Sequence, residues 1–163
     1  MKGYSLLIAL VLFALSLTAP ASAQEANIGD TRNQTTALTT KYSGKRGVMA
    51  MSCNDGIKLR TAKSILRKDF GEEFAKSVEA FTIIVYKDAS AEEADLINKD
   101  IAQITNALLQ IDLKDKIKKE ETEAYGYVQL SPDKKFVNDI VVVFKKPAPM
   151  LIYIGGKFNA DNM

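Results

Sequence analysis

The chain has 163 residues, of which 47% are hydrophobic, with 22 basic and 20 acidic side chains, no histidine and one cysteine. The lack of histidine excludes Ser-His-Asp and Cys-His triads, imidazole zinc sites and histidine general bases. A net charge of +2 is far from the basic excess of a general nucleic-acid-binding protein, and a single cysteine cannot form an internal disulfide.

The first 23 residues have the pattern of a secretory signal peptide. Lys2 gives a short positive start, residues 6–17 form an apolar run, and residues 21–23, Ala-Ser-Ala, match the small-x-small cleavage pattern. The apolar run is shorter than the roughly 20 residues that span a bilayer, so we predict no transmembrane segment. We expect cleavage after Ala23 and an exported product, periplasmic or secreted.

The remaining 140 residues (163 minus 23) are enough for one domain with its own hydrophobic core and too few for two. Residues 24–33 are polar and lack periodicity, which predicts a mobile arm. Residues 34–163 then form a single domain. Its first element is a short helix over residues 34–42, in which Leu38 and Tyr42 lie on one face.

A strand is predicted next, over residues 48–53. Both of its faces are largely apolar, which places it inside the sheet and not at an edge. Cys53 at its end has two interpretations, a reactive or metal-binding thiol and a buried apolar thiol. The second is favoured because no histidine base or second soft ligand accompanies it.

A short motif links the first helix to this strand. It consists of Tyr42, Ser43, Gly44, Lys45, Arg46, Gly47 and Val48. Placed after a signal peptide and a short helix, it resembles the opening motif of a family of small exported bacterial proteins known as domain of unknown function 4252. The later order of elements, with glycines at 155 and 156, is similar along most of the mature chain. The resemblance implies an envelope protein without an assigned activity, sometimes encoded near sigma-factor and anti-sigma-factor systems, and with no catalytic residues to transfer.

Residues 57–70 predict an amphipathic basic helix, where members of that family commonly have a more acidic one. The apolar positions at helical spacing are Leu59, Ala62, Ile65, Leu66 and Phe70. The basic residues at the other positions are Lys58, Arg60, Lys63, Arg67 and Lys68. Two readings remain open, attraction to an anionic surface such as lipid headgroups and an ordinary solvated face on a core helix.

A second internal strand is predicted over residues 80–87, since its apolar residues occupy both faces. Ser90 followed three residues later by Glu93 forms a capping box and begins a helix over residues 91–109. The apolar stripe of this helix consists of Ile97, Ile101, Ile104 and Leu108.

The last part of the chain predicts a three-stranded antiparallel meander over residues 122–130, 136–144 and 150–154. We expect Leu130 opposite Phe136 and Phe144 opposite Met150. One face is then almost wholly apolar and must be covered by helices. The predicted fold is a two-layer α+β sandwich, with a mixed sheet of about five strands ending in this meander and two main helices packed on one face.

The opposite face of the meander carries the candidate interaction residues. They are Tyr125, Tyr127, Asp139, Val141 and Tyr153. The expected register places Tyr125, Val141 and Tyr153 in one row. Rigid aromatic groups with a polar tip suit a recognition surface. The alternatives are that the N-terminal arm covers this face, or that tyrosines simply favour strands.

No catalytic, cofactor or metal site is predicted. The glutamate pairs at 72–73, 92–93 and 120–121 fit helix ends or surface, because adjacent side chains diverge. The Gly-Gly-Lys at 155–157 lacks the spacing of a phosphate loop. We predict a non-enzymatic binding module of the cell envelope, whose partner is a protein, a small ligand or a second copy through a sheet face or edge. The alternatives are a carboxylate-based enzyme, metal-dependent or not, and a membrane-surface protein that uses the basic helix.

Overall fold

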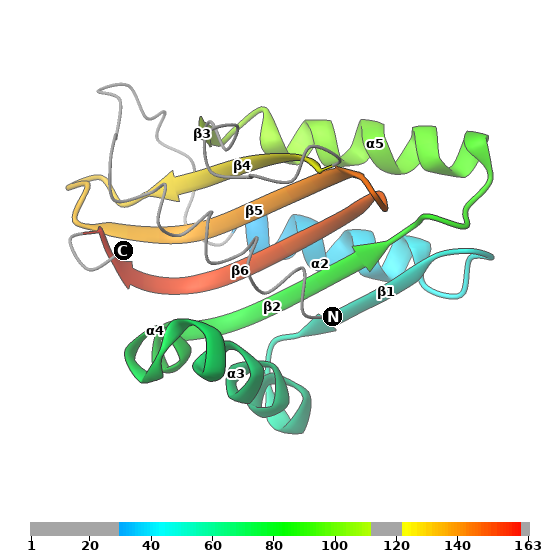
Figure 1. Cartoon of the computed structure of the whole chain (residues 1–163). Helices are drawn as coiled ribbons and strands as arrows, with labels where there is room; N and C mark the ends of the chain where they lie inside the picture. The colour runs from blue at the N-terminus through cyan, green and yellow to red at the C-terminus, as the bar shows by residue number, and fades with distance from the viewer. Residues whose placement is uncertain (1–29, 112–121, 161–163) are drawn as a thin grey trace.

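The computed structural model describes residues 30–111 and 122–160. These residues form four α-helices and six β-strands (Figure 1). In chain order the elements are α2 (Asp30–Tyr42), β1 (Met49–Cys53), α3 (Gly56–Phe70), α4 (Glu72–Ser77), β2 (Val78–Val85), α5 (Ala91–Thr105), β3 (Leu109–Ile111), β4 (Glu123–Leu130), β5 (Phe136–Lys146) and β6 (Met150–Asn159). The predicted signal peptide, residues 24–29 of the predicted arm and the glutamates at 120 and 121 lie outside the described residues.

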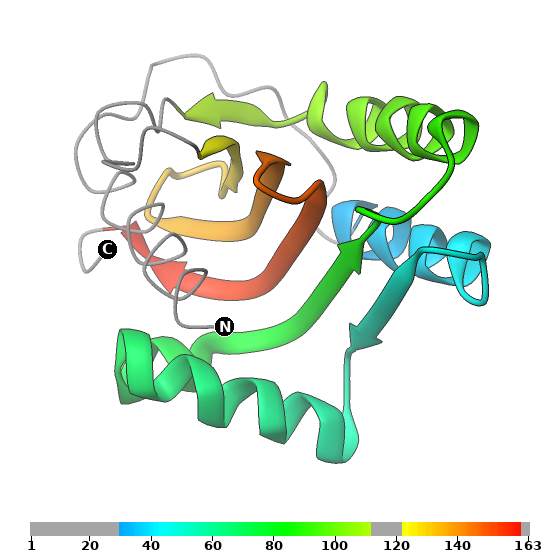
Figure 2. The same cartoon turned by 45° about the vertical axis from the view of Figure 1, so that its right-hand side comes forward.

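The sheet confirms the predicted α+β class and differs in detail. Its six described strands are ordered β1-β2-β6-β5-β4-β3, and every neighbouring pair is antiparallel, where we predicted a mixed sheet. The meander of β4, β5 and β6 is confirmed, and its long strands curve strongly (Figure 2). Strand β3 was not predicted. Strand β2 is internal as expected, but the prediction that β1 lies inside the sheet is wrong, because β1 forms an edge.

The helices cover both faces of the sheet. On one face, α2 and α5 pack against buried apolar side chains of the strands. The helices contribute Leu38, Tyr42, Ile97, Ile101 and Ile104 to this contact. On the other face, Leu66 of α3 joins the apolar residues of the meander, and α4 packs beside it. Figures 1 and 2 show α2 and α5 well away from the α3–α4 pair. The two main predicted helices, now α3 and α5, therefore pack on different faces.

Helix α2 is longer than its apolar residues indicate. It begins at Asp30, so the predicted mobile arm is wrong for residues 30–33. The first turns bury Thr31 and Thr35, and the Thr35 hydroxyl donates to the Thr31 carbonyl at 2.9 Å. A threonine side chain that satisfies its hydroxyl in this way can be buried without adding to an apolar pattern. Helix α5 is shorter than predicted. It ends at Thr105 and not at residue 109, because the chain turns there into β3.

A register shift changes the predicted pairing within the meander. Phe144 pairs with Met150 as predicted, but Leu130 pairs with Val137 and not with Phe136, because the register of β4 and β5 shifts after Gln129. A bulge adds one residue to a strand, and hydrophobic alternation in the sequence does not reveal it. As a result, the row across the three strands consists of Tyr127, Val141 and Tyr153, and the predicted row with Tyr125 is wrong.

Candidate functional site

The tyrosine-bearing face of the meander is covered, not free. Asp139, Val141 and Tyr153 are buried, and Tyr153 has no exposed surface, so the prediction of an interaction face is wrong for these three. The cover comes from α2 and α5, and α2 includes the last four residues of the predicted arm. Tyr125 and Tyr127 are half-buried near the margin of this layer.

A buried polar pair lies under α2. The Tyr153 hydroxyl donates to Asp139 Oδ1 at 2.6 Å. Gly155 pairs with Asp139 across the strands, and a Cβ on Gly155 would lie 2.2 Å from the Tyr153 hydroxyl oxygen. The absence of a side chain at Gly155 therefore provides the space in which this hydrogen bond forms.

The electrostatics of this pair disfavour ionisation. Burial raises the pKa of Asp139, and the hydrogen bond from Tyr153 and the charge of Arg32 offset only part of that effect. Burial, followed by the negative charge of Asp139, also raises the pKa of Tyr153. Arg32 itself donates to Glu79 Oε2 at 2.9 Å. Asp139 Oδ2 has no hydrogen-bond partner within the described residues. The pair can orient the strands and α2, and it is closed to a large ligand.

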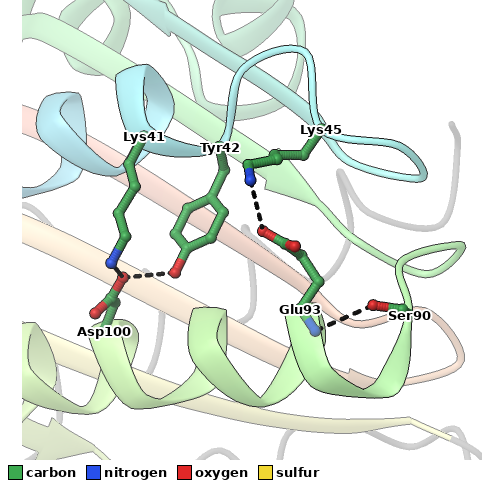
Figure 3. Close-up of polar contacts among 6 residues, drawn as sticks. All are labelled: Lys41, Tyr42, Lys45, Ser90, Glu93 and Asp100. Carbon is green, nitrogen blue, oxygen red and sulfur yellow. Dashed lines mark hydrogen bonds and ion pairs between the residues drawn. The ribbon is translucent and has the colours of Figure 1, made fainter.

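The contact between α2 and α5 is polar at its margin (Figure 3). Lys41 Nζ and the Tyr42 hydroxyl both reach Asp100 Oδ2, each at 2.6 Å. Burial alone would raise the pKa of Asp100, but the hydrogen bonds from Lys41 and Tyr42 outweigh it, and the pKa lies below its ordinary value. The predicted cap is confirmed, because the Glu93 amide donates to Ser90 Oγ at 3.2 Å.

The family-like motif has a structural explanation in these contacts. After Tyr42, the Ser43 amide donates to a carbonyl of the last turn of α2, and Gly44 adopts a φ of 78° that ends the helix. Lys45 Nζ lies 3.9 Å from Glu93 Oε1 on α5 (Figure 3). Gly47 also has a φ of 78°, and a Cβ there would lie 2.0 Å from the Asp88 carbonyl oxygen. The motif thus holds the turn after α2 against α5 and the loop that precedes it.

The other candidates that the sequence offers stay apart from one another. Cys53 is buried at the end of β1, and burial raises the pKa of its thiol. Glu72 pairs with Arg67 at 2.7 Å and with Lys76 at 3.7 Å, as expected of a surface carboxylate. Across residues 30–111 and 122–160, no three Cys, Asp or Glu side chains are grouped to hold a metal ion. No described helix is long and apolar enough to cross a membrane.

The sequence reasoning named the basic residues of the helix over residues 57–70 as a possible surface site, but it missed the exposed apolar side chains beside them on β1 and α3. These large apolar side chains are Met49 (56% exposed), Met51 (41%), Ile57 (76%) and Ile65 (52%). We call these four residues, with Lys58, Arg60 and Lys68, the β1–α3 surface. Ile65 belongs to the predicted apolar stripe of this helix, but it is exposed. Helix α3 contacts β1, β2 and α4, and only a narrow stripe with Leu66 at its centre is buried.

The two elements present this surface on the same side of the sheet. Met49 and Met51 pair across the ladder with Val85 and Ile83. Val85 and Ile83 pack against the core cluster that contains Leu66 of α3. Because paired residues in an antiparallel ladder point to the same face, the two methionines lie on the face that α3 covers. The apolar character of both faces of β1 therefore reflects this exposure and not an internal position.

Comparisons of the chain with protein-family models, with curated proteins and with solved structures gave no match. The resemblance to domain of unknown function 4252 stays a prediction.

Proposed function

We propose that the chain is a non-enzymatic interaction module of the cell envelope that binds its partner through the β1–α3 surface. The observation that carries this proposal is the exposure of four large apolar side chains on one side of the sheet edge. Contiguous exposed apolar area on a folded domain is typical of an interaction site. The tyrosine-bearing face does not serve this purpose, because α2 and α5 cover it.

Two features support binding instead of catalysis. The chain has no histidine, so its acid-base chemistry would depend on carboxylates, lysines and tyrosines. The buried carboxylate of Asp139 and the partly buried one of Asp100 are each bonded to a different tyrosine and lie in separate places. Asp139 is buried, and Asp100 is bound by Lys41 and Tyr42.

The location in the envelope rests on the N-terminal sequence. A positive start, an apolar run and the Ala-Ser-Ala pattern ending at Ala23 support export to the periplasm or the medium. The motif from Tyr42 to Val48 supports the same location through the family it resembles.

Site-specific photo-crosslinking tests the proposal. A benzophenone amino acid replaces Ile65 in α3 or Met51 in β1, and a matched one replaces Leu96, an isolated exposed leucine of α5 that is 44% exposed. The benzophenone reacts with any C–H bond nearby, whether of protein or of lipid. We expect adducts in producing cells at positions 65 and 51 and none at 96. Equal adducts at all three positions, or none at any, would contradict the proposal.

A further inference from the structure

The outward side of α3 combines apolar and cationic side chains within single helical turns. Ile57, Ile65 and Lys68 follow one another at spacings of eight and three residues, which places them along one side of the helix. Lys58 lies seven residues before Ile65 and flanks the same stripe. All four side chains are exposed. Leu66, by contrast, points to the core and is 4% exposed.

The charge of this helix is one-sided. From Gly56 to Phe70 it contains five basic residues and one acidic residue, Asp69. Arg67 pairs with Glu72, and Lys63 donates to the Lys76 carbonyl. Among the side chains that the structure describes, which do not include that of Asp69, no carboxylate forms an ion pair with the cations that complete the surface. These are Lys58, Arg60 and Lys68.

We infer that the partner of the β1–α3 surface is an anionic lipid surface, an inference that rests on the proposed function. Lysine is depleted at the core of protein interfaces, where its ammonium group would be desolvated. At a bilayer, exposed isoleucines flanked by lysines are favourable. Isoleucines enter the boundary between headgroups and acyl chains, while the long lysine side chains extend back to the phosphates.

The methionines of β1 fit this partner. Met49 and Met51 are unbranched and flexible, so they adapt to an irregular apolar surface. They lie on the side of the sheet that α3 covers and can therefore meet the same bilayer as Ile57 and Ile65. No covalent step is involved, and binding is reversible.

Vesicle co-sedimentation of the exported chain tests the inference. The vesicles contain either an equimolar mixture of phosphatidylglycerol and phosphatidylcholine or phosphatidylcholine alone. We expect binding to the anionic vesicles only, and its loss as salt rises from about 0.01 M to about 1 M, over which the Debye length falls from about 30 Å to about 3 Å.

Two sets of variants locate the binding. The triple variant Lys58→Gln, Arg60→Gln, Lys68→Gln should weaken the partition coefficient about 100-fold. The double variant Ile57→Ser, Ile65→Ser should weaken it about tenfold or more. A charge-matched control, Lys99→Gln, Lys135→Gln, Lys146→Gln, changes exposed lysines of α5 and both ends of β5 and should bind as the unchanged chain does. Circular dichroism and urea unfolding verify that each variant is folded.

Several results would overturn the inference. They are binding that ignores lipid charge and salt, an equal loss in the charge-matched control, and no vesicle binding at all. If vesicles do not bind while the benzophenone at position 65 forms an adduct with a protein, the lipid inference fails and the interaction surface stands. If neither experiment gives a signal, both proposals fail.

Discussion

Helices α5 and α3 have the same length, 15 residues, and both are amphipathic, yet they meet the rest of the chain differently. On α5, the polar side chains Glu93 and Asp100 are bound to Lys45, Lys41 and Tyr42 from α2 and the turn after it. On α3, isoleucines and lysines face outward. The polar side chains Glu93 and Asp100 of α5 are therefore used for contacts within the chain, whereas the outward isoleucines and lysines of α3 are available to a partner.

The largest effect should come from a glycine in the first region. Gly47→Ala forces a side chain into a left-handed backbone conformation and against the Asp88 carbonyl oxygen. We expect a loss of about 3 kcal/mol or more in the free energy of unfolding. Gly56→Ala, at the start of α3, has the same sign of φ but open space around it and should cost only about 1 kcal/mol. Urea unfolding measures both, and equal losses would mean that the turn is not held against the loop before α5.

The second-largest effect should come from the buried pair of Tyr153 and Asp139 under α2. Tyr153→Phe removes the donor to Asp139 and leaves a buried carboxyl group without a partner. We expect a loss of about 2 kcal/mol. The control, Tyr125→Phe, removes a hydroxyl that donates to Glu123 near the surface and should cost clearly less than Tyr153→Phe. A Tyr153→Phe variant as stable as the control would show that the pair contributes nothing.

The two carboxylates beside tyrosines should respond to pH in opposite directions. The pKa of Asp100 lies below its ordinary value of 3.8 in the folded chain, so its contribution is present above 3.8 and is lost as the pH falls through the folded-state pKa. The pKa of Asp139 lies above 3.8, so stability falls as the pH rises from 3.8 through that higher pKa.

Substitution separates the two contributions. Asp100→Asn should reduce the loss of stability in acid, by about 1 kcal/mol or less because the carboxylate is near the surface. Asp139→Asn should reduce the loss of stability that occurs as the pH rises above 3.8. Urea titrations across a pH series measure both, and a shift of both variants in the same direction would show that one of the two assignments is wrong.

The smallest effect belongs to α3. Ile57→Ser and Ile65→Ser should each change the free energy of unfolding by about 0.5 kcal/mol or less, because both side chains are exposed. Leu66→Ala, one position along the helix from Ile65, should cost about 2 kcal/mol or more. Differential scanning calorimetry can compare the three. If Ile65→Ser were as costly as Leu66→Ala, the β1–α3 surface would be part of the core.

Much of the fold could be predicted because local patterns determine it. The apolar β-branched run from Phe136 to Phe144 and the capping box at Ser90 each place an element correctly. The start of α2 could not be predicted, because threonines that bond to their own helix carry no apolar signal. The bulge after Gln129 was equally invisible, and it changed which tyrosine joins the row with Tyr153.

The candidate site was harder to predict for a related reason. Helical spacing showed that Ile65 and Leu66 both fit an apolar stripe, but only the position of α3 beside β1 and β2 decides which of them is buried. The sequence left open whether the tyrosine face is free or covered by the N-terminal arm, because α2, which covers it together with α5, has few apolar residues. The exposure of a side chain depends on packing between segments that are distant in the sequence. It therefore cannot be predicted from the sequence of one segment.

The lengths of the edge strands limit how copies of the chain can pair with one another. The two edges of the described sheet are its shortest strands, three residues in β3 and five in β1, whereas the internal strands have 8 to 11. Short edges limit backbone pairing between molecules and so protect a concentrated protein from aggregating sheet to sheet. A homodimer through a sheet edge, one of the partners that the sequence suggested, would have only these few backbone groups to join it.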